Sequence, residues 1–292
     1  MGTYLLLQLV KILPQNLMSH LTGLLVELRI PHPYWAKKAR EWFVSFFGIN
    51  MAEAEHPLDE YSTIQSVFTR RLKPGIRPIQ GPFCSPADGM FTRSGPVTTA
   101  SILPAKAHSY STGELVYGDP AHAAPFAVGW SCTVYLAPHN YHRVHAPVSG
   151  TLKAIRYIPG KLWPVAPFFA KHLPRLFVEN ERVVFDIKTD RGWAYVVMVG
   201  ALNVGKITPA HIDPPFYSNS ADRLLQVPPV TTVTCSHKIQ IGDELGTFML
   251  GSTVIVLLSS KEMEEYPASI LSPAHPIPVQ LGTSLLTEAP QP

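Results

Sequence analysis

The chain has 292 residues, of which 46% are hydrophobic, so it can bury the core of one large domain or two small ones. Its net charge of +3 lies in residues 1–50, which carry five Lys or Arg and two Glu and leave 19 basic and 19 acidic residues elsewhere. This small, local excess excludes a nucleic-acid-binding surface. The three cysteines form no CxxC pair and favour a reducing compartment over a disulfide framework.

The N-terminal residues 5–28 have the periodicity of an amphipathic helix. Apolar residues recur every three or four positions with polar residues between them, and Pro14 is expected to interrupt the helix. The polar residues argue against a membrane-spanning helix, which needs about 20 mainly apolar residues. A signal peptide is not expected either, because an early basic cluster, a clean apolar stretch and a cleavage site are missing.

Residues 34–47 predict a second helix, in which aromatic side chains stand beside basic ones. The basic residues are Lys37, Lys38 and Arg40. Such a helix suits a membrane interface with anionic lipid, and the alternative is that both helices simply pack on the body of the protein. We expect residues 1–50 to form amphipathic membrane-binding helices and residues 51–292 to form a β-rich domain.

The chain contains 29 prolines and 19 glycines, which are residues that commonly end helices and form turns. Their frequency favours many short strands over long helices in the rest of the chain. The fold class is therefore expected to be mostly β, of the α+β type. Runs of β-branched, aliphatic and aromatic residues predict strands at residues 132–137, 151–158, 182–189, 193–199 and 252–259.

Residues 85–91 and 146–152 share the pattern small-Pro-x-[Asp/Ser]-Gly-x-apolar. Each is predicted to be a tight turn that leads into a strand, with glycine supplying a positive φ. The repetition suggests a pseudo-duplicated β-barrel or sandwich. Similar turns occur in carrier modules that bear a lipoyl or biotinyl group, although neither turn here contains an attachment lysine.

Four residues of the body could support acid–base chemistry. Asp88 stands in Pro-Ala-Asp-Gly, which is also a common turn sequence, and His139, His142 and His145 crowd into seven residues. The histidines could form a polar loop, a metal site or an acid–base site. No metal is expected, because His142 and His145 would fall on opposite faces of a strand and no carboxylate–histidine pair completes a zinc set.

The candidate nucleophile is Ser252, at the beginning of the last predicted strand. Gly251 precedes it and has no side chain to block attack on its carbonyl group. A hydroxyl held beside this carbonyl can convert the amide into an ester if a His–Asp pair accepts the proton. A Gly-Ser pair can also simply begin a strand, and the residues alone leave both interpretations open.

The chain resembles phosphatidylserine decarboxylases of the bacterial and mitochondrial type over nearly its whole length. The similarity rests on several short motifs that occur in the same order and spacing. They lie at residues 68–72, 77–79, 86–89, 105–111, 141–145, 157–160, 177, 180–182, 199–205 and 250–253.

This resemblance implies a self-cleaving proenzyme. Ser252 would attack the carbonyl of Gly251, and β-elimination of the ester would release a large chain, 1–251, from a small chain, 252–292. The small chain would begin with a pyruvoyl group made from Ser252. By the same resemblance, His145 is the base, Asp88 orients it, and His142 contacts the headgroup or delivers a proton.

The implied reaction converts phosphatidylserine into phosphatidylethanolamine and CO₂ through a Schiff base with the pyruvoyl group. The expected partners are phosphatidylserine in anionic membranes and the two chains of one precursor, with a homodimer as a candidate assembly. The expected location is peripheral, on the cytoplasmic face of a bacterial cell membrane. Two other functions compete: a Ser-His-Asp hydrolase with intact Ser252, and a non-enzymatic membrane-bound module of carrier type.

Overall fold

The fold was analysed in a computed structural model of the whole chain. The structure describes residues 14–98, 101–105, 108–119, 128–202, 206–212, 229–249, 252–264 and 270–287. The predicted helix of residues 5–28 therefore lies outside the described residues up to position 13, and so does Gly251 of the predicted cleavage site.

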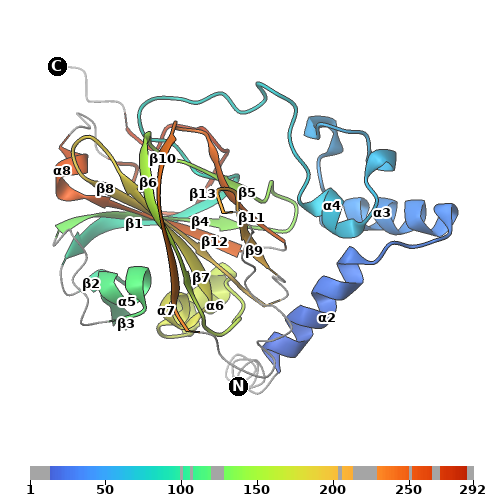
Figure 1. The fold of residues 1–292 in the computed structure, drawn as a ribbon, viewed down its shortest axis with the longest axis horizontal. Helices are drawn as coiled ribbons and strands as arrows, with labels where there is room; N and C mark the ends of the chain where they lie inside the picture. The colour runs from blue at the N-terminus through green and yellow to red at the C-terminus, as the bar shows by residue number, and fades with distance from the viewer. Residues whose placement is uncertain are drawn as a thin grey trace.

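Two helices at the N-terminus project to one side of the sheets (Figure 1), as the sequence predicts. Helix α2 (Gln15–Glu27) begins directly after Pro14. Helix α3 (Pro33–Phe47) has proline at its first position, where no amide hydrogen bond is lost, and ends at Gly48 with φ 68°. The short helix α4 (Ile64–Phe68) follows, capped by the side chain of Thr63.

A ten-stranded antiparallel sheet forms the body of the protein, in the order β10-β6-β7-β8-β12-β4-β1-β2-β3, with β13 paired to β1. The order has two open ends, so the sheet is not the closed barrel that the sequence offered as one alternative. The mostly β, α+β class is confirmed. The strands of this sheet are β1 (Gly89–Thr98), β2 (Ser101–Ala105), β3 (His108–Tyr110), β4 (Val128–Leu136), β6 (Gly150–Ile158), β7 (Arg182–Lys188), β8 (Trp193–Val199), β10 (Thr231–Ile239), β12 (Ser252–Ser259) and β13 (Ile277–Val279).

A second, three-stranded sheet lies beside the first and has the order β5-β11-β9. Its strands are β5 (Arg143–His145), β9 (Ile207–Pro209) and β11 (Glu244–Phe248). Short helices complete the fold at α5 (Thr112–Tyr117), α6 (Pro167–His172), α7 (Leu176–Glu179) and α8 (Ser260–Met263), with 3-10 turns at Met51–Glu53 and Leu58–Glu60.

Strand β12 is the best-buried element of the large sheet. All eight of its residues are buried, and it pairs with β4 on one side and β8 on the other. Its apolar run favours a strand with both faces covered, which is the position that it occupies. Because β11 precedes β12, the chain passes from the small sheet to the large one just before Ser252.

The two Pro-x-x-Gly turns lead into strands as predicted, since Gly89 opens β1 and Gly150 opens β6. The predicted positive φ is wrong, because neither glycine is among the residues with positive φ. Glycine is required at these two positions because the neighbouring strand leaves no room for a side chain. A Cβ on Gly89 would stand 2.3 Å from the carbonyl oxygen of Tyr135, and one on Gly150 would stand 2.6 Å from that of Lys188.

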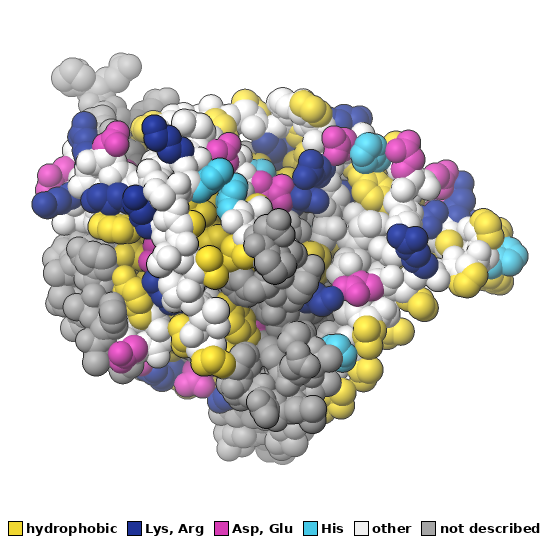
Figure 2. Space-filling view, in the orientation of Figure 1, with side chains coloured by type: hydrophobic (Ala, Val, Ile, Leu, Met, Phe, Trp, Pro, Cys, Tyr) yellow, Lys and Arg dark blue, Asp and Glu magenta, His cyan; other side chains and the backbone are white. Residues whose placement is uncertain are grey.

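The basic face predicted on α3 is smaller than expected. Arg40 is buried, and the two lysines pair with acidic side chains: Lys38 with Glu41 at 2.9 Å and Lys37 with Asp59 at 3.4 Å. The exposed surface of α2 and α3 is instead strongly apolar, as Figure 2 shows along the arm that these helices form.

Candidate active site

Ser252 begins the central strand β12 and is fully buried. Its register partner in β4 is Leu136, the last residue of that strand. The Ser252 hydroxyl has no hydrogen-bond partner among the described residues. A buried hydroxyl without a partner costs about 1–3 kcal/mol, so its retention at this point indicates a chemical or binding role.

A cavity of about 600 Å³ adjoins Ser252. It lies between the N-terminal helices and the ends of the central strands β4 and β12. Its walls are almost entirely apolar. The lining residues are Thr22, Leu25 and Val26 of α2; Trp42, Phe43 and Phe47 of α3; Ile64 and Phe68 of α4; and Tyr135, Leu136, Pro138, Pro164, Val165, Ala166, Ala201, Leu202 and Ser252 of the body. Such a cavity suits a ligand with hydrocarbon chains.

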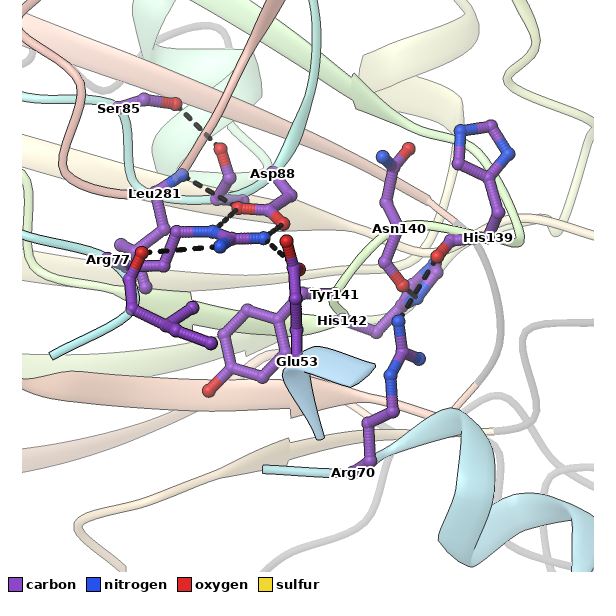
Figure 3. Close-up of polar contacts among 12 residues, drawn as sticks. Glu53, Arg70, Arg77, Ser85, Asp88, His139, Asn140, Tyr141, His142 and Leu281 are labelled. Carbon is purple, nitrogen blue, oxygen red and sulfur yellow. Dashed lines mark hydrogen bonds and ion pairs between the residues drawn. The ribbon is translucent and has the colours of Figure 1, made fainter. Parts of the chain in front are cut away.

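Asp88 is held by a bidentate ion pair with Arg77. The Arg77 Nε donates to Asp88 Oδ1 at 3.0 Å and Nη2 donates to Oδ2 at 2.7 Å (Figure 3). The backbone amide of Leu281 adds a third bond to Oδ1 at 2.8 Å, and Arg77 also binds Glu53 at 2.6 Å. These two carboxylates raise the pKa of Arg77, so the guanidinium stays charged and fixes the Asp88 carboxylate in place.

His145 is oriented by a backbone carbonyl. Its Nδ1 lies 2.7 Å from the oxygen of Gly242, and because a carbonyl only accepts, Nδ1 carries the proton. Nε2 is then free to accept the hydroxyl proton of Tyr141, 3.1 Å away. Burial lowers the pKa of His145, so the ring is neutral and Nε2 carries an unprotonated lone pair.

The carboxylate of Asp88 and the ring of His145 are neighbours without a direct bond. The backbone amide of His145 donates to Pro86, two residues before Asp88, at 2.8 Å. No hydrogen bond joins Asp88 to His145, or His145 to Ser252, among the residues that the structure describes. The predicted roles of the three residues therefore stay predictions.

His142 is the most deeply buried histidine of the site. Its Nδ1 donates to the carbonyl of Asn140 at 2.9 Å, while Nε2 is buried without a partner among the described residues. The centroid of the Phe68 ring lies 3.9 Å from the centroid of the His142 ring. Burial lowers the pKa of His142 to about 3, so the ring is neutral at physiological pH and Nε2 is a hydrogen-bond acceptor.

The backbone brings His142 towards the beginning of β12. The amide of Phe248, at the end of β11, donates to the carbonyl of His142 at 3.0 Å. His139 is exposed, in contrast to His142 and His145. In the described part of the chain, no group of three or more His, Cys, Asp or Glu residues has a metal-binding arrangement.

Comparison with known proteins gives a consistent result. The family model described as phosphatidylserine decarboxylase matches residues 64–286. The chain belongs to the phosphatidylserine decarboxylase family. A phosphatidylserine decarboxylase proenzyme of Pseudomonas putida is 40% identical over 267 residues, which cover 87% of this chain and 88% of that protein. Proenzymes of the same name from Alkalilimnicola ehrlichii and Pseudomonas fluorescens are 39% and 38% identical, covering 89% and 94% of both chains.

Membership of the phosphatidylserine decarboxylase family confirms the predicted family and enzyme class. The name "proenzyme" of the relatives agrees with the expectation of a precursor. The family model begins at the first residue of α4, so α2 and α3 lie outside the segment that it matches.

The sequence analysis missed several residues that build the site. Arg77 and Tyr141 appeared there only as parts of family motifs, and Gly242 did not appear at all. Each acts through a contact distant in sequence: Arg77 is 11 residues from Asp88, and Gly242 is 97 residues from His145. No local sequence pattern predicts such contacts. The exception is Arg77, since an arginine shortly before an Asp-Gly turn could have suggested an ion pair with the aspartate.

Proposed function

We propose that this chain is a proenzyme that cleaves itself before Ser252 and then decarboxylates phosphatidylserine to phosphatidylethanolamine. The observation that carries the proposal is the fully buried hydroxyl of Ser252, which has no hydrogen-bond partner in the described part of the chain and lies at the wall of an apolar cavity, in a member of this family. An apolar cavity beside a reactive position is what a substrate with acyl chains requires.

In the proposed self-cleavage, Ser252 Oγ attacks the carbonyl carbon of Gly251. The C–N bond breaks as the ester C–O bond forms, and neutral His145 accepts the hydroxyl proton at Nε2. The Asp88 carboxylate, fixed in place by its bidentate contact with Arg77, stabilises the imidazolium by its charge. Elimination then leaves a carboxylate on Gly251, and hydrolysis of the remaining enamine releases ammonia.

The described residues fit a pyruvoyl group at position 252, because Ser252 is buried at a cavity wall lined by apolar side chains. When present, that group supplies a carbonyl that reacts with amines and accepts the electrons released by decarboxylation. The apolar lining offers water few hydrogen-bond partners beside the reacting atoms. Neutral His142, whose Nδ1 donates to the carbonyl of Asn140, contacts the headgroup by accepting a hydrogen bond from the substrate ammonium at Nε2.

The proposal includes peripheral binding to the cytoplasmic face of a bacterial cell membrane that contains anionic lipid. No helix in the described residues is long and apolar enough to cross a bilayer. Helix α2 exposes Leu17, Leu21, Leu24 and Leu28 at helical spacing, and α3 exposes Trp35, Trp42 and Phe46. This apolar face stands beside the cavity, which gives a lipid a short path from bilayer to site. A homodimer stays a candidate assembly.

The test is decarboxylation of dihexanoyl phosphatidylserine by the wild-type protein and by Ser252→Ala. We expect the wild type to release CO₂ and Ser252→Ala to remain a single chain without turnover. Ser260→Ala is the matched control, since Ser260 is exposed at the first position of α8, directly after the other end of that strand, and it is expected to behave as the wild type. Turnover by an uncut Ser252→Ala chain would contradict the proposal.

The two competing functions predict different results in the same assay. A hydrolase with intact Ser252 would form an acyl-enzyme and stay one chain, and a carrier-type module would show no dependence on Ser252. Among the described residues, no hydrogen bond joins Asp88 to His145. This argues against a preformed Ser-His-Asp triad, and therefore against the hydrolase with intact Ser252.

A further inference from the structure

Arg70 is a buried arginine whose charge is not compensated by any ion pair in the described part of the chain. Its side chain is 4% exposed, and Nε and Nη1 have no hydrogen-bond partner there. Nη2 alone is engaged and donates to the carbonyl of His139 at 3.2 Å (Figure 3). A guanidinium keeps its charge at any physiological pH, so burial without an anion is costly.

The carboxylates near Arg70 are already bound elsewhere. Asp88 and Glu53 attract Arg70 through space, yet both form their ion pairs with Arg77, at 2.7 Å and 2.6 Å. Arg70 and Arg77 thus differ sharply: one arginine has two carboxylates and the other has none. This difference points to an anion that comes from outside the described chain.

The position of Arg70 fits an anion of the substrate. Arg70 follows the α4 residue Phe68, which lines the cavity and stacks on His142. Its bond to His139 places the guanidinium against the residue that follows Pro138, another wall of the cavity. The charge of Arg70 also contributes to the lowered pKa of His142, so the two side chains are close.

We propose that Arg70 binds the phosphodiester of the lipid substrate beside the cavity wall that Phe68 and Pro138 form. The inference rests on the proposed decarboxylation of phosphatidylserine and adds the residue that recognises its phosphate. In that lipid the phosphodiester links the acyl-bearing glycerol to serine. Arg70 lies behind the cavity wall formed by Phe68 and Pro138 and close to His142, which is near enough to meet this group when the headgroup is at Ser252.

The carboxylate of the serine headgroup is the other candidate anion, and the chemistry disfavours it. That carboxylate leaves as neutral CO₂, so a strong ion pair to it would weaken in the transition state and slow the reaction. A contact with the phosphodiester persists through the reaction. Arg70 should thus contribute equally to the binding of substrate and product, which changes KM and not kcat.

The experiment measures the equilibrium binding of dihexanoyl phosphatidylethanolamine, which has the phosphodiester and lacks the carboxylate. It compares wild type, Arg70→Gln and Arg71→Gln by calorimetry. Arg71 is the matched control because it is the exposed neighbour with the same charge. We expect Kd to rise about ten- to hundredfold in Arg70→Gln only, with a similar rise in KM for dihexanoyl phosphatidylserine and little change in kcat.

Two results would overturn the role of Arg70. An unchanged Kd in Arg70→Gln with a raised KM would assign Arg70 to the carboxylate, and no change in either would make it structural. If Arg70→Gln does not fold, the wild type is tested with a phosphatidylserine analogue methylated to a neutral phosphotriester, whose KM should rise at least tenfold. An unchanged KM would refute the proposal. Because the binding arm needs no turnover, failure of decarboxylation by the wild type would count only against the proposed function.

Discussion

Arg77 fixes the orientation of Asp88, and its replacement should slow self-cleavage. In Arg77→Gln, Asp88 keeps the bond from the Leu281 amide and loses both bonds to the guanidinium. Without this bidentate contact the carboxylate is no longer held in one position beside His145. We expect cleavage to slow about tenfold or more at pH 7.

The rate at which the small chain appears after synthesis in vitro checks this expectation. Arg77→Lys should retain part of the rate, because it keeps the charge and loses the bidentate geometry. Arg71→Gln controls for loss of a positive charge at the surface. Cleavage of Arg77→Gln at the rate of the wild type would contradict a positioning role.

His142 should make the folded protein sensitive to acid. Its pKa is about 3 in the folded state and ordinarily about 6.5 in an unfolded chain. Between these values the unfolded state binds one more proton, so the free energy of unfolding falls as the pH falls, by about 1.4 kcal/mol per pH unit.

Urea unfolding of the single-chain Ser252→Ala protein, measured from pH 7 to pH 4, tests this linkage. His142→Gln in the same background removes the titrating group and should flatten the dependence by up to one proton. His145 shifts in the same direction and supplies part of the remaining slope. Equal slopes with and without His142 would show that the ring is not buried in the neutral form.

At the scale of elements, the α2 leucines should anchor the protein to lipid. Leu21 and Leu28 are 49% and 60% exposed, so Leu21→Ser/Leu28→Ser should cost the fold little. Burying one leucine in an apolar phase gains about 1.5–3 kcal/mol, so the double variant should bind vesicles at least about tenfold more weakly.

Sedimentation with vesicles of mixed neutral and anionic lipid measures this binding. Val230→Ser/Val233→Ser is the matched control, since both valines are exposed on or beside β10, away from α2. We expect the control to bind like the wild type. Equal loss in both double variants, or none in the leucine variant, would exclude α2 as the anchor.

How far the elements could be predicted depended on burial. Strands β8 and β12 match their predicted ranges, because their apolar runs are long and fully covered. Strand β10 was not predicted, because it is exposed and polar along most of Thr231–Ile239 and its sequence lacks the alternation of apolar and polar residues that indicates a strand. For strand β1 only the turn that leads into it was predicted and not its range, because it contains Gly95 and Pro96, which normally interrupt strands.

The candidate site was predictable only in part for a similar reason. Resemblance to a family identified Asp88, His142, His145 and Ser252, each inside a short motif. The contacts that define their protonation and orientation come from residues brought close by folding, as Gly242 is to His145. The unpaired Arg70 guanidinium could not be predicted, since missing partners are a property of the folded structure.

At the scale of the whole molecule, the two predicted chains would remain one folded unit after cleavage. The small chain would contain β12, which lies between β4 and β8 of the large chain, and β13, which pairs with β1. The amide of Leu281 would also bind Asp88 across the two chains. Cleavage before Ser252 would thus expose a new reactive end without opening the sheet, and separation of the chains would require unfolding.

The most direct test of the account is the intact mass of the purified wild-type protein under denaturing conditions. The account predicts two chains that meet between Gly251 and Ser252, with a blocked amino terminus on the smaller. Their summed mass should equal that of the precursor plus one water and minus one ammonia. A single chain of full mass in an active preparation would contradict self-cleavage. So would two chains whose sum shows only an added water and a free serine amino terminus, which is the product of ordinary proteolysis.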